Sequence, residues 1–174
     1  MPRITVVTGA PGTGKTTFSK RLAALDPRGI HVVSDVFYGF PAHPVDPTRP
    51  ESHDQNTAIV RAVARSAGAF AESGWPVVLD GIFGPWFLPE LRGALPEGAP
   101  VEYVVLRAPL DLCLRRVRER DGTGASAKVE HMHRALTDLG ALSAHAMEAG
   151  GLDPEELVGR FVAERERFAL AGAA

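Results

Sequence analysis

Apolar residues gather in short runs that alternate with segments of helical periodicity. The runs cover residues 4–8, 30–33, 76–80 and 101–106, and a weaker run covers 144–147. Strands that are apolar almost throughout, and rich in β-branched residues, are typical of a parallel sheet covered by helices on both faces. The pattern therefore predicts an α/β domain with a mostly parallel sheet.

Helical patterns lie between these runs, at residues 16–25, 55–71, 110–120 and 127–142. A further helix begins at Asp153, which stands in the N-cap position before Pro154, with Glu156 at the third helical position. Residues 38–50 contain four prolines in their last ten positions, so we expect a loop there. The sheet continues beyond this loop, and residues 1–174 are predicted to form a single domain.

The composition excludes several classes of protein. With 174 residues, 45% of them hydrophobic and 23% charged, the chain is long and apolar enough for one globular core. Its net charge of −2 gives no basic surface of the kind that binds nucleic acid. The single cysteine, Cys113, stands in an apolar stretch and is expected to be a buried thiol in a reducing compartment.

The N-terminus and the hydropathy bear on localisation. The chain enters its first apolar run at residue 4, which leaves no room for a signal peptide. No apolar segment approaches the roughly 18 residues that a membrane span needs. We therefore expect a cytoplasmic protein that has no membrane partner.

A complete phosphate-binding motif directly follows the first apolar run. The pattern G-x-x-x-x-G-K-[ST] consists of Gly9, Ala10, Pro11, Gly12, Thr13, Gly14, Lys15 and Thr16. In such a loop, backbone N–H groups surround phosphate oxygens, Lys15 reaches the β- and γ-phosphates, and the Thr16 hydroxyl binds Mg²⁺. The helix that starts here adds its positive end, and we include Thr17 in the expected nucleotide site. A G-x-G-x-x-G dinucleotide fingerprint is excluded, because position 17 is not glycine.

Two aspartates follow predicted strands, at the edge where parallel α/β sheets bind their ligands. Asp80 closes the run 76–80 and is a candidate ligand of Mg²⁺ or of one of its waters. A turn cap with Gly81 is the alternative. Asp35 follows the run 30–33, where a carboxylate can accept the proton of an acceptor hydroxyl. The alternative for Asp35 is an N-cap of a following helix.

Four arginines lie near the end of the helix predicted at 110–120: Arg115, Arg116, Arg118 and Arg120. Arg116 and Arg120 are four residues apart and share one helical face. Because a Gly-rich segment follows, we expect residues 115–128 to form a mobile lid in which these two arginines clamp the transferring phosphoryl group. A solvated charged face is the alternative.

These features together resemble the small P-loop kinases of metabolites and antibiotics. That group includes chloramphenicol phosphotransferase, the zeta toxins, gluconate kinase and shikimate kinase. The resemblance is carried by the phosphate loop, an aspartate after the second strand, Asp-Gly after the third, and R-x-x-x-R following 106–109. Only the loop is highly specific.

The resemblance implies both a fold and a site. The fold is a three-layer P-loop NTPase fold with a five-stranded parallel sheet in the order 2-3-1-4-5 and an arginine-bearing lid. In the site, Asp35 is the catalytic base, and the loop that contains Gly150 lies near the nucleotide base. The acceptor region matches neither the zeta-toxin sugar-nucleotide pattern nor the arginine set of shikimate kinase, so the resemblance does not name the acceptor.

Aromatic residues gather after the second and third predicted strands and favour a partly apolar acceptor. We expect the substrate site to contain Asp35, Phe37, Tyr38, Asp80, Phe83 and Trp86, with Phe40, Ile82 and Phe87 in the same segments. Closing the core beneath the loops is the alternative role of these aromatics. Polar contacts to the acceptor are expected from a second group: His43, Asp46, Arg49, His53, Asp54 and Gln55.

The sequence thus favours a monomeric or homodimeric enzyme that uses ATP and Mg²⁺ to phosphorylate a hydroxyl of a small metabolite or antibiotic. The candidate catalytic residues are Lys15, Asp35, Arg116 and Arg120. The alternatives are a zeta-toxin-like kinase of a nucleotide sugar, a nucleoside or nucleotide kinase, and a nucleotide-dependent switch with a protein partner. A zinc site is not expected, because His131 and His133 are two apart on a predicted helix and point to different sides.

Overall fold

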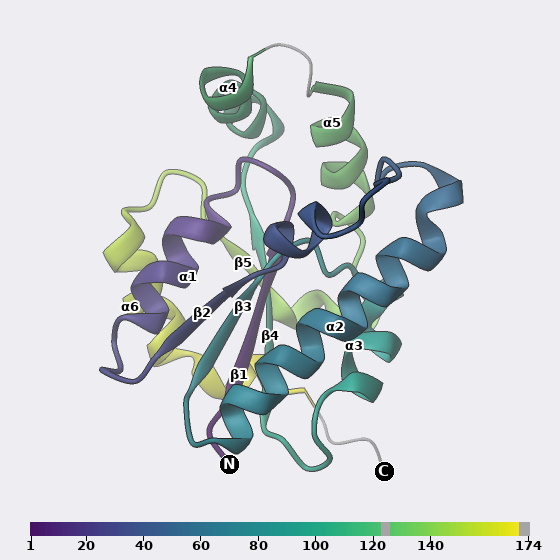
Figure 1. Cartoon of the computed structure of the whole chain (residues 1–174). Helices are drawn as coiled ribbons and strands as arrows, with labels where there is room; N and C mark the ends of the chain where they lie inside the picture. Colours follow the sequence, from purple (N-terminus) through teal and green to yellow (C-terminus); the bar gives the residue numbers. More distant parts are fainter. Residues whose placement is uncertain (123–125, 171–174) are drawn as a thin grey trace.

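The computed structural model describes residues 1–122 and 126–170. At its centre is a five-stranded sheet in which all neighbouring strands are parallel (Figure 1). The strands are β1 (Ile4–Gly9), β2 (Ile30–Val33), β3 (Val77–Asp80), β4 (Val101–Arg107) and β5 (Ala146–Glu148). Their order is β2-β3-β1-β4-β5, which confirms the predicted α/β P-loop topology.

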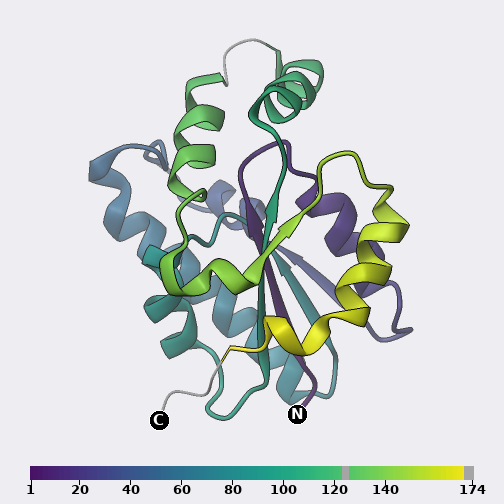
Figure 2. The same ribbon diagram turned by 180° about the vertical axis from the view of Figure 1, so that it is seen from behind.

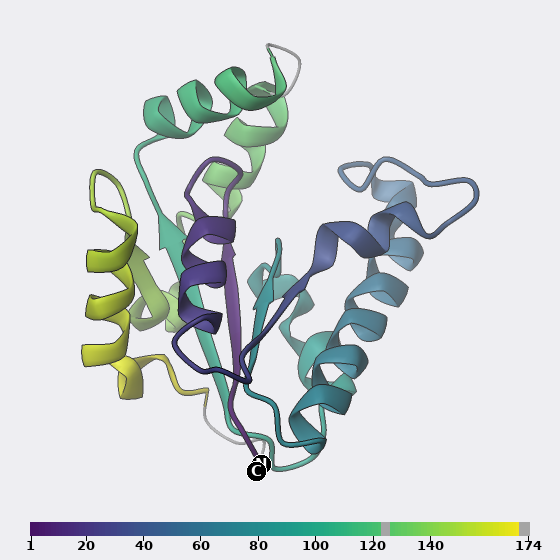
Figure 3. The same cartoon turned by 60° about the vertical axis from the view of Figure 1, so that its left-hand side comes forward.

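Helices cover both faces of the sheet (Figure 3). They are α1 (Lys15–Ala23) and α6 (Pro154–Ala163) on one face, and α2 (His53–Glu72) and α3 (Leu88–Ala94) on the other. Strand residues alternate between two cores, so that Val6 packs on the α2 side and Val7 on the α1 side. In the second core, the rings of Phe18 and Phe161 meet edge to face, 5.6 Å apart. Burial of both faces explains why the strands are apolar along their length.

The strand register brings the ends of three strands to one level. Val7 of β1 and Val33 of β2 both pair with Asp80 of β3. The phosphate loop, which starts at the end of β1, and Asp35, two residues after β2, therefore begin at the same edge of the sheet as Asp80.

Two helices stand beyond the carboxyl ends of the strands (Figures 1 and 2). They are α4 (Leu110–Asp121) and α5 (Ser126–Ala135), and they pack against each other. Cys113 and Val117 of α4 share a buried cluster with Val129 of α5. The Cys113 thiol is fully buried, as predicted, and this burial raises its pKa. Residues 123–125 of the predicted lid lie outside the described residues.

The helix predicted at 127–142 is wrong in its second half. Helix α5 ends at Ala135, a turn follows, and a short 3-10 helix, η5 (Gly140–His145), begins at a glycine with φ of 51°. Leu136 and Leu139 are buried in the main core and happen to continue the apolar spacing of the helix. The periodicity therefore persists beyond the end of α5.

Two further elements differ from prediction. Helix α3 was not predicted: it is short, has a proline in its first turn, and fully buries only Leu91. Strand β5 starts two residues later than expected and is three residues long. The cap of α6 is confirmed, because the carboxylate of Asp153 accepts a hydrogen bond from the N–H of Glu155 at 2.8 Å. None of the helices in the described part of the chain is long and apolar enough to cross a membrane.

The proline-rich loop is confirmed between two 3-10 helices. These are η1 (Ser34–Gly39) and η2 (Pro50–Ser52), with neither helix nor strand between them. Gln55 fastens the loop to α2: its side-chain amide exchanges two hydrogen bonds, each 2.8 Å long, with the backbone of Val45. Asp46 closes a local turn by accepting hydrogen bonds from the N–H and hydroxyl of Thr48.

Candidate active site

The loop between β1 and α1 has the conformation that its glycines allow. Gly12 and Gly14 have φ values of 86° and 97°, in the left-handed region that side chains disfavour. A Cβ at Gly12 would lie only 2.5 Å from the carbonyl oxygen of Cys113, so α4 rests directly on the loop. Gly14 is the N-cap of α1 and has no side chain, which leaves the first N–H groups of α1 available to an anion.

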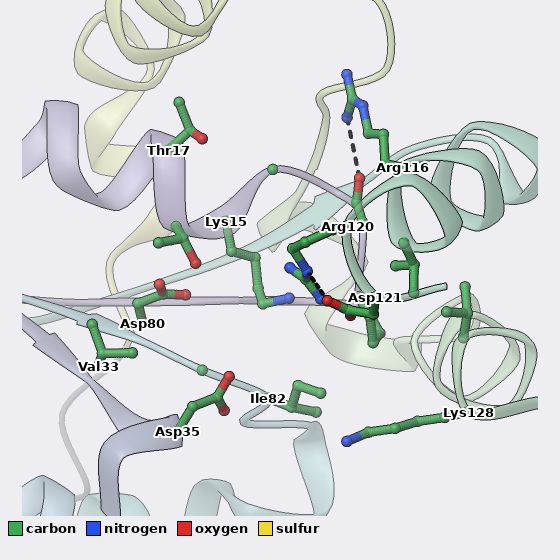
Figure 4. A pocket seen from close by; sticks show the side chains of 17 residues that line it. Lys15, Thr17, Val33, Asp35, Asp80, Ile82, Arg116, Arg120, Asp121 and Lys128 are labelled. Carbon is green, nitrogen blue, oxygen red and sulfur yellow. Dashed lines mark hydrogen bonds and ion pairs between the residues drawn. The ribbon is translucent and has the colours of Figure 1, made fainter. Parts of the chain in front are cut away.

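Among the described residues, seven charged side chains line one cavity of about 360 Å³ (Figure 4): Lys15, Asp35, Asp80, Arg116, Arg120, Asp121 and Lys128. Its walls are formed by Pro11, Gly12, Gly14, Lys15, Thr16, Thr17, Val33, Asp35, Asp80, Gly81, Ile82, Arg116, Val117, Arg120, Asp121, Lys128 and Val129. We call this space the phosphate cavity. It unites most of the predicted nucleotide residues with the predicted base and the two predicted lid arginines.

Charged groups inside the phosphate cavity influence one another. Burial lowers the pKa of Lys15, and the carboxylates of Asp80 and Asp35 oppose that shift. The Lys15 ammonium donates a 3.1 Å hydrogen bond to the carbonyl of Ala10 at the start of the loop. A phosphate would give this ammonium stronger, charged acceptors.

Thr16 and Asp80 fit the binding of Mg²⁺. Both line the phosphate cavity, and hydroxyl and carboxylate oxygens are ligands that Mg²⁺ prefers. Asp80 is only 2% exposed, at the end of β3, and its Oδ2 lies 3.4 Å from Nε2 of His31 on β2. No cluster of three or more His, Cys, Asp or Glu side chains suited to a metal occurs within residues 1–122 and 126–170. His133 instead places Nε2 3.0 Å from the carbonyl oxygen of Ala108.

The arginines divide into two pairs. Arg116 and Arg120 line the phosphate cavity, whereas Arg115 and Arg118, on other faces of α4, do not. Arg116 donates a 3.1 Å hydrogen bond to the carbonyl of Gly12. Arg120 makes two hydrogen bonds with its neighbour Asp121, at 2.7 and 2.6 Å, and this pairing raises the pKa of Arg120.

A second cavity of about 360 Å³ adjoins the first. It is lined by Asp35, Tyr38, Pro47, Thr48, Arg49, Pro50, Ser52, His53, Asn56, Ile82, Trp86, Phe87, Lys128, His131, Met132 and Ala135. We call it the acceptor cavity. Asp35, Ile82 and Lys128 line both cavities, so the two spaces meet at these side chains.

The predicted aromatic residues separate into those that line the acceptor cavity and those that do not. Tyr38 and Trp86 line it, and burial raises the pKa of the Tyr38 phenol. Phe83 is 1% exposed and belongs to the core, where its carbonyl accepts a 2.7 Å hydrogen bond from the Tyr103 hydroxyl. Phe37 packs on the same core and against Phe40, with ring centroids 5.1 Å apart. Phe37 and Phe83 therefore lie where the alternative interpretation of the sequence places them, in the part of the core that closes beneath the loops.

Other predicted site residues lie outside both cavities. Ala10 and Thr13 line a separate cavity of about 300 Å³ between the loop and α5, and Gly9 is the last residue of β1. A Cβ at Gly150 would lie 2.6 Å from Cδ of Pro109, so that loop rests against the start of α4. Of the predicted polar contacts, Arg49 and His53 line the acceptor cavity, whereas His43, Asp46, Asp54 and Gln55 do not.

Sequence reasoning missed one wall of the acceptor cavity. Lys128, His131, Met132 and Ala135 form it, at the spacing i, i+3, i+4 and i+7 of a single face of α5. The spacing was visible in the sequence, but nothing there indicated that this face turns toward Asp35. Asn56 was also missed. It is 7% exposed, and its Nδ2 donates to the carbonyl of Pro47 at 2.9 Å, which leaves Oδ1 without a partner within the described residues.

A glycine loop between β1 and α1, with two lysines, three carboxylates and two arginines around one cavity, defines a protein of the P-loop NTPase fold. The chain belongs to the AAA domain family, whose sequence profile matches residues 6–135.

Solved structures agree with this assignment of the fold. The chain is similar to an unliganded sugar kinase from Janibacter sp. HTCC2649, with 21% identity over 95% of each chain and a TM-score of 0.72. It is similar to a gluconokinase from Sinorhizobium meliloti 1021, with 19% identity over 97% of this chain and 94% of the other, and a TM-score of 0.69. A shikimate kinase from Acinetobacter baumannii, in complex with shikimate, has 18% identity, covers 93% of this chain and 91% of its own, and gives a TM-score of 0.61. No curated protein matches the sequence.

Proposed function

We propose that the protein is an ATP-dependent phosphotransferase that moves the γ-phosphoryl group to a hydroxyl of a small, moderately apolar molecule. The observation that supports this most directly is the position of Asp35 in the walls of both cavities. The Asp35 carboxylate lies where the phosphate cavity meets the acceptor cavity. This arrangement suits transfer of a group between two small molecules, one bound in each cavity. The kinases among the structures of similar fold support the same class of reaction.

The proposed step uses side chains that line the phosphate cavity. The acceptor oxygen attacks the γ-phosphorus, its proton passes to the Asp35 carboxylate, and the bond from the γ-phosphorus to the β,γ-bridging oxygen breaks to release ADP. Lys15, Arg116 and Arg120 hold the phosphates and offset the charge that develops on the transferring group. Thr16 and Asp80 would hold Mg²⁺, which neutralises phosphate charge when it is bound.

The acceptor cavity suits a molecule with an apolar body. Tyr38, Trp86, Phe87 and Met132 supply apolar surface, while Asn56 adds a polar side chain to the wall. Trp86 is 45% exposed, so an acceptor ring that covered it would remove a large apolar area from water. This combination favours a ring-bearing metabolite or antibiotic over a small polyanion.

A transfer screen tests the proposal. The purified protein is incubated with Mg²⁺ and ATP labelled in the γ-phosphate, across hydroxylated antibiotics, sugars, nucleosides and nucleotide sugars. We expect the label to appear in one acceptor class, and the screen separates the proposed activity from nucleoside, nucleotide and nucleotide-sugar kinases. Hydrolysis of ATP that no acceptor changes, together with a stable protein partner in pull-down, would instead indicate a nucleotide-dependent switch.

The Asp35→Asn variant tests the base. We expect kcat for transfer to fall at least about 100-fold, because general-base catalysis contributes that much, while the Kd for ATP stays near the wild-type value. Asp54→Asn is the matched control, since Asp54 is exposed and lines neither cavity. Lys15→Ala should weaken both ATP binding and transfer. Wild-type turnover by Asp35→Asn would refute the assignment of the base.

A further inference from the structure

Lys128 lines both cavities but has no part in the step proposed above. Only three described residues line both cavities: the negatively charged Asp35, the apolar Ile82 and the positively charged Lys128. Figure 4 shows the Lys128 side chain extending from α5 into the cavity, on the side of Asp35 and Ile82. A positive charge therefore stands where the two cavities meet, opposite the proposed base.

Helix α5 holds Lys128 at this junction. The adjacent residue, Val129, is fully buried in the cluster that joins α5 to Cys113 and Val117 of α4. Lys128 itself begins the helical face that continues through His131 and Met132 along the acceptor cavity. The same turn of helix thus anchors α5 and points Lys128 into the space between the nucleotide and the acceptor.

Lys128 differs from the other cations of the phosphate cavity in having no fixed partner. Lys15 donates to the Ala10 carbonyl, Arg116 donates to the Gly12 carbonyl, and Arg120 is paired with Asp121. Within the described residues, the ammonium of Lys128 makes no hydrogen bond and no salt bridge; its charge acts only at longer range, where it contributes to lowering the pKa of Asp46 and of Asp121. A lysine is a compact charge on a flexible stem, so its ammonium can follow a group that moves over a short distance.

We propose that Lys128 is a further catalytic residue, whose ammonium binds the γ-phosphoryl group while it passes from the phosphate cavity to the acceptor cavity. This inference rests on the proposed function. During the step, the acceptor oxygen bonds to phosphorus, the bond to the bridging oxygen of ADP breaks, and the hydroxyl proton goes to Asp35. Lys128 keeps its protons and donates hydrogen bonds to the nonbridging oxygens throughout.

Nucleotide binding tests the role of Lys128 without an identified acceptor. Calorimetry with Mg²⁺ compares ADP, AMP-PNP, and ADP with aluminium fluoride on the full chain and on Lys128→Met, Lys128→Arg and Lys20→Met. Lys20 is the matched control, because it is exposed on α1 and lines neither cavity. For Lys128→Met we expect AMP-PNP affinity to fall about tenfold and ADP affinity less than about twofold, which is the loss of one charged hydrogen bond to the γ-phosphate.

Aluminium fluoride, which mimics the group in transit, should lose at least as much affinity as AMP-PNP, and Lys128→Arg should recover part of both losses. Lys20→Met should bind all three ligands like the wild type. Unchanged AMP-PNP affinity in Lys128→Met, or an equal loss for ADP and AMP-PNP, overturns the assignment. If the transfer screen finds no acceptor, the proposed function fails, and these affinities still decide whether Lys128 contacts the γ-phosphate.

Discussion

At the scale of single residues, Gly12 has a demanding position in the loop. Its φ of 86° is strained for any side chain, and an added Cβ would lie 2.5 Å from the Cys113 carbonyl oxygen of α4. We expect Gly12→Ala to lower the free energy of unfolding by about 2 kcal/mol and to weaken ATP binding, because either the loop or α4 must move. Urea unfolding and ATP titration measure the two effects.

Gly93→Ala is the control for that prediction. Gly93 lies in α3, and apart from its chain neighbours and the backbone of its own helix no described atom lies within 4 Å of the position of its added Cβ. The substitution should stabilise the protein by about 0.5–1 kcal/mol, since alanine is the better helix former, and ATP binding should not change. If Gly12→Ala behaved in the same way, the loop would not need its left-handed glycine.

The residues of the site were predictable where a local motif defines them. The phosphate loop, Asp35 and Asp80 could be predicted because a glycine pattern and strand-end carboxylates are local features. Phe83 could not be placed, because its burial depends on Tyr103, which comes from another strand. Lys128 was missed for a similar reason. Its sequence neighbourhood is ordinary, and the role that we propose for it follows only from where α5 packs.

At the scale of elements, α4 carries a carboxylate that we expect to compete with phosphate for Arg120. Asp121 pairs with Arg120 through two hydrogen bonds and also lines the phosphate cavity. Asp121→Asn removes a negative charge from the cavity and frees the Arg120 guanidinium. We therefore expect the Kd for Mg²⁺·ATP to fall about two- to fivefold at low salt, with a smaller effect at high salt.

Calorimetry at two ionic strengths checks this prediction. Glu119→Gln is the matched control, because Glu119 is exposed on the same helix and lines neither cavity. The control should leave ATP affinity nearly unchanged. Weaker ATP binding by Asp121→Asn would mean that Asp121 orients Arg120 for the phosphate and does not compete with it.

The boundaries of elements were less predictable than their existence. Five strands and four of the helices follow from apolar runs and periodicity, and α6 follows from its cap residues, but α3 is too short and too poorly buried to give a clear pattern. The end of α5 was misjudged because Leu136 and Leu139, which follow the helix, are buried in the main core and continue its apolar spacing. Periodicity reports burial, and burial can continue where the helix has stopped.

At the scale of the whole molecule, the strand order follows from the family resemblance and not from the apolar runs. The runs establish a parallel sheet, yet they do not say which strands are neighbours. What also escaped prediction is how the two ends of the described chain are joined. Glu102 of β4 accepts hydrogen bonds from Arg3 at 2.8 Å, from Thr5 at 2.6 Å and from Arg165 at 2.6 and 3.0 Å. Arg165 belongs to the C-terminal 3-10 helix η6 (Arg165–Phe168).

This Glu102 network should make stability depend on pH. Burial raises the pKa of Glu102, but the hydrogen bonds from Arg165, Thr5 and Arg3 outweigh it, so the pKa lies below the usual value of 4.5. A depressed pKa means that the folded state favours the carboxylate more than the unfolded state does. The stabilisation is therefore fully present above pH 4.5 and is lost as the pH falls through the lower pKa of the folded protein.

Glu102→Gln measures this contribution. At pH 7 it should lower the free energy of unfolding by about 2 kcal/mol, because Arg3 and Arg165 lose their buried anionic partner. The loss is no larger because both arginine side chains are partly exposed and remain in contact with water. The difference from wild type should shrink as the pH falls below 4.5, since both proteins then carry a neutral side chain at this position. Urea unfolding at a series of pH values follows the change.

Glu166→Gln is the control, because Glu166 lies 3.6 Å from Arg3 but its side chain is 87% exposed, so its effect should be small at every pH. A difference between Glu102→Gln and wild type that stays constant down to pH 3 would show that the carboxylate charge does not hold the two ends together.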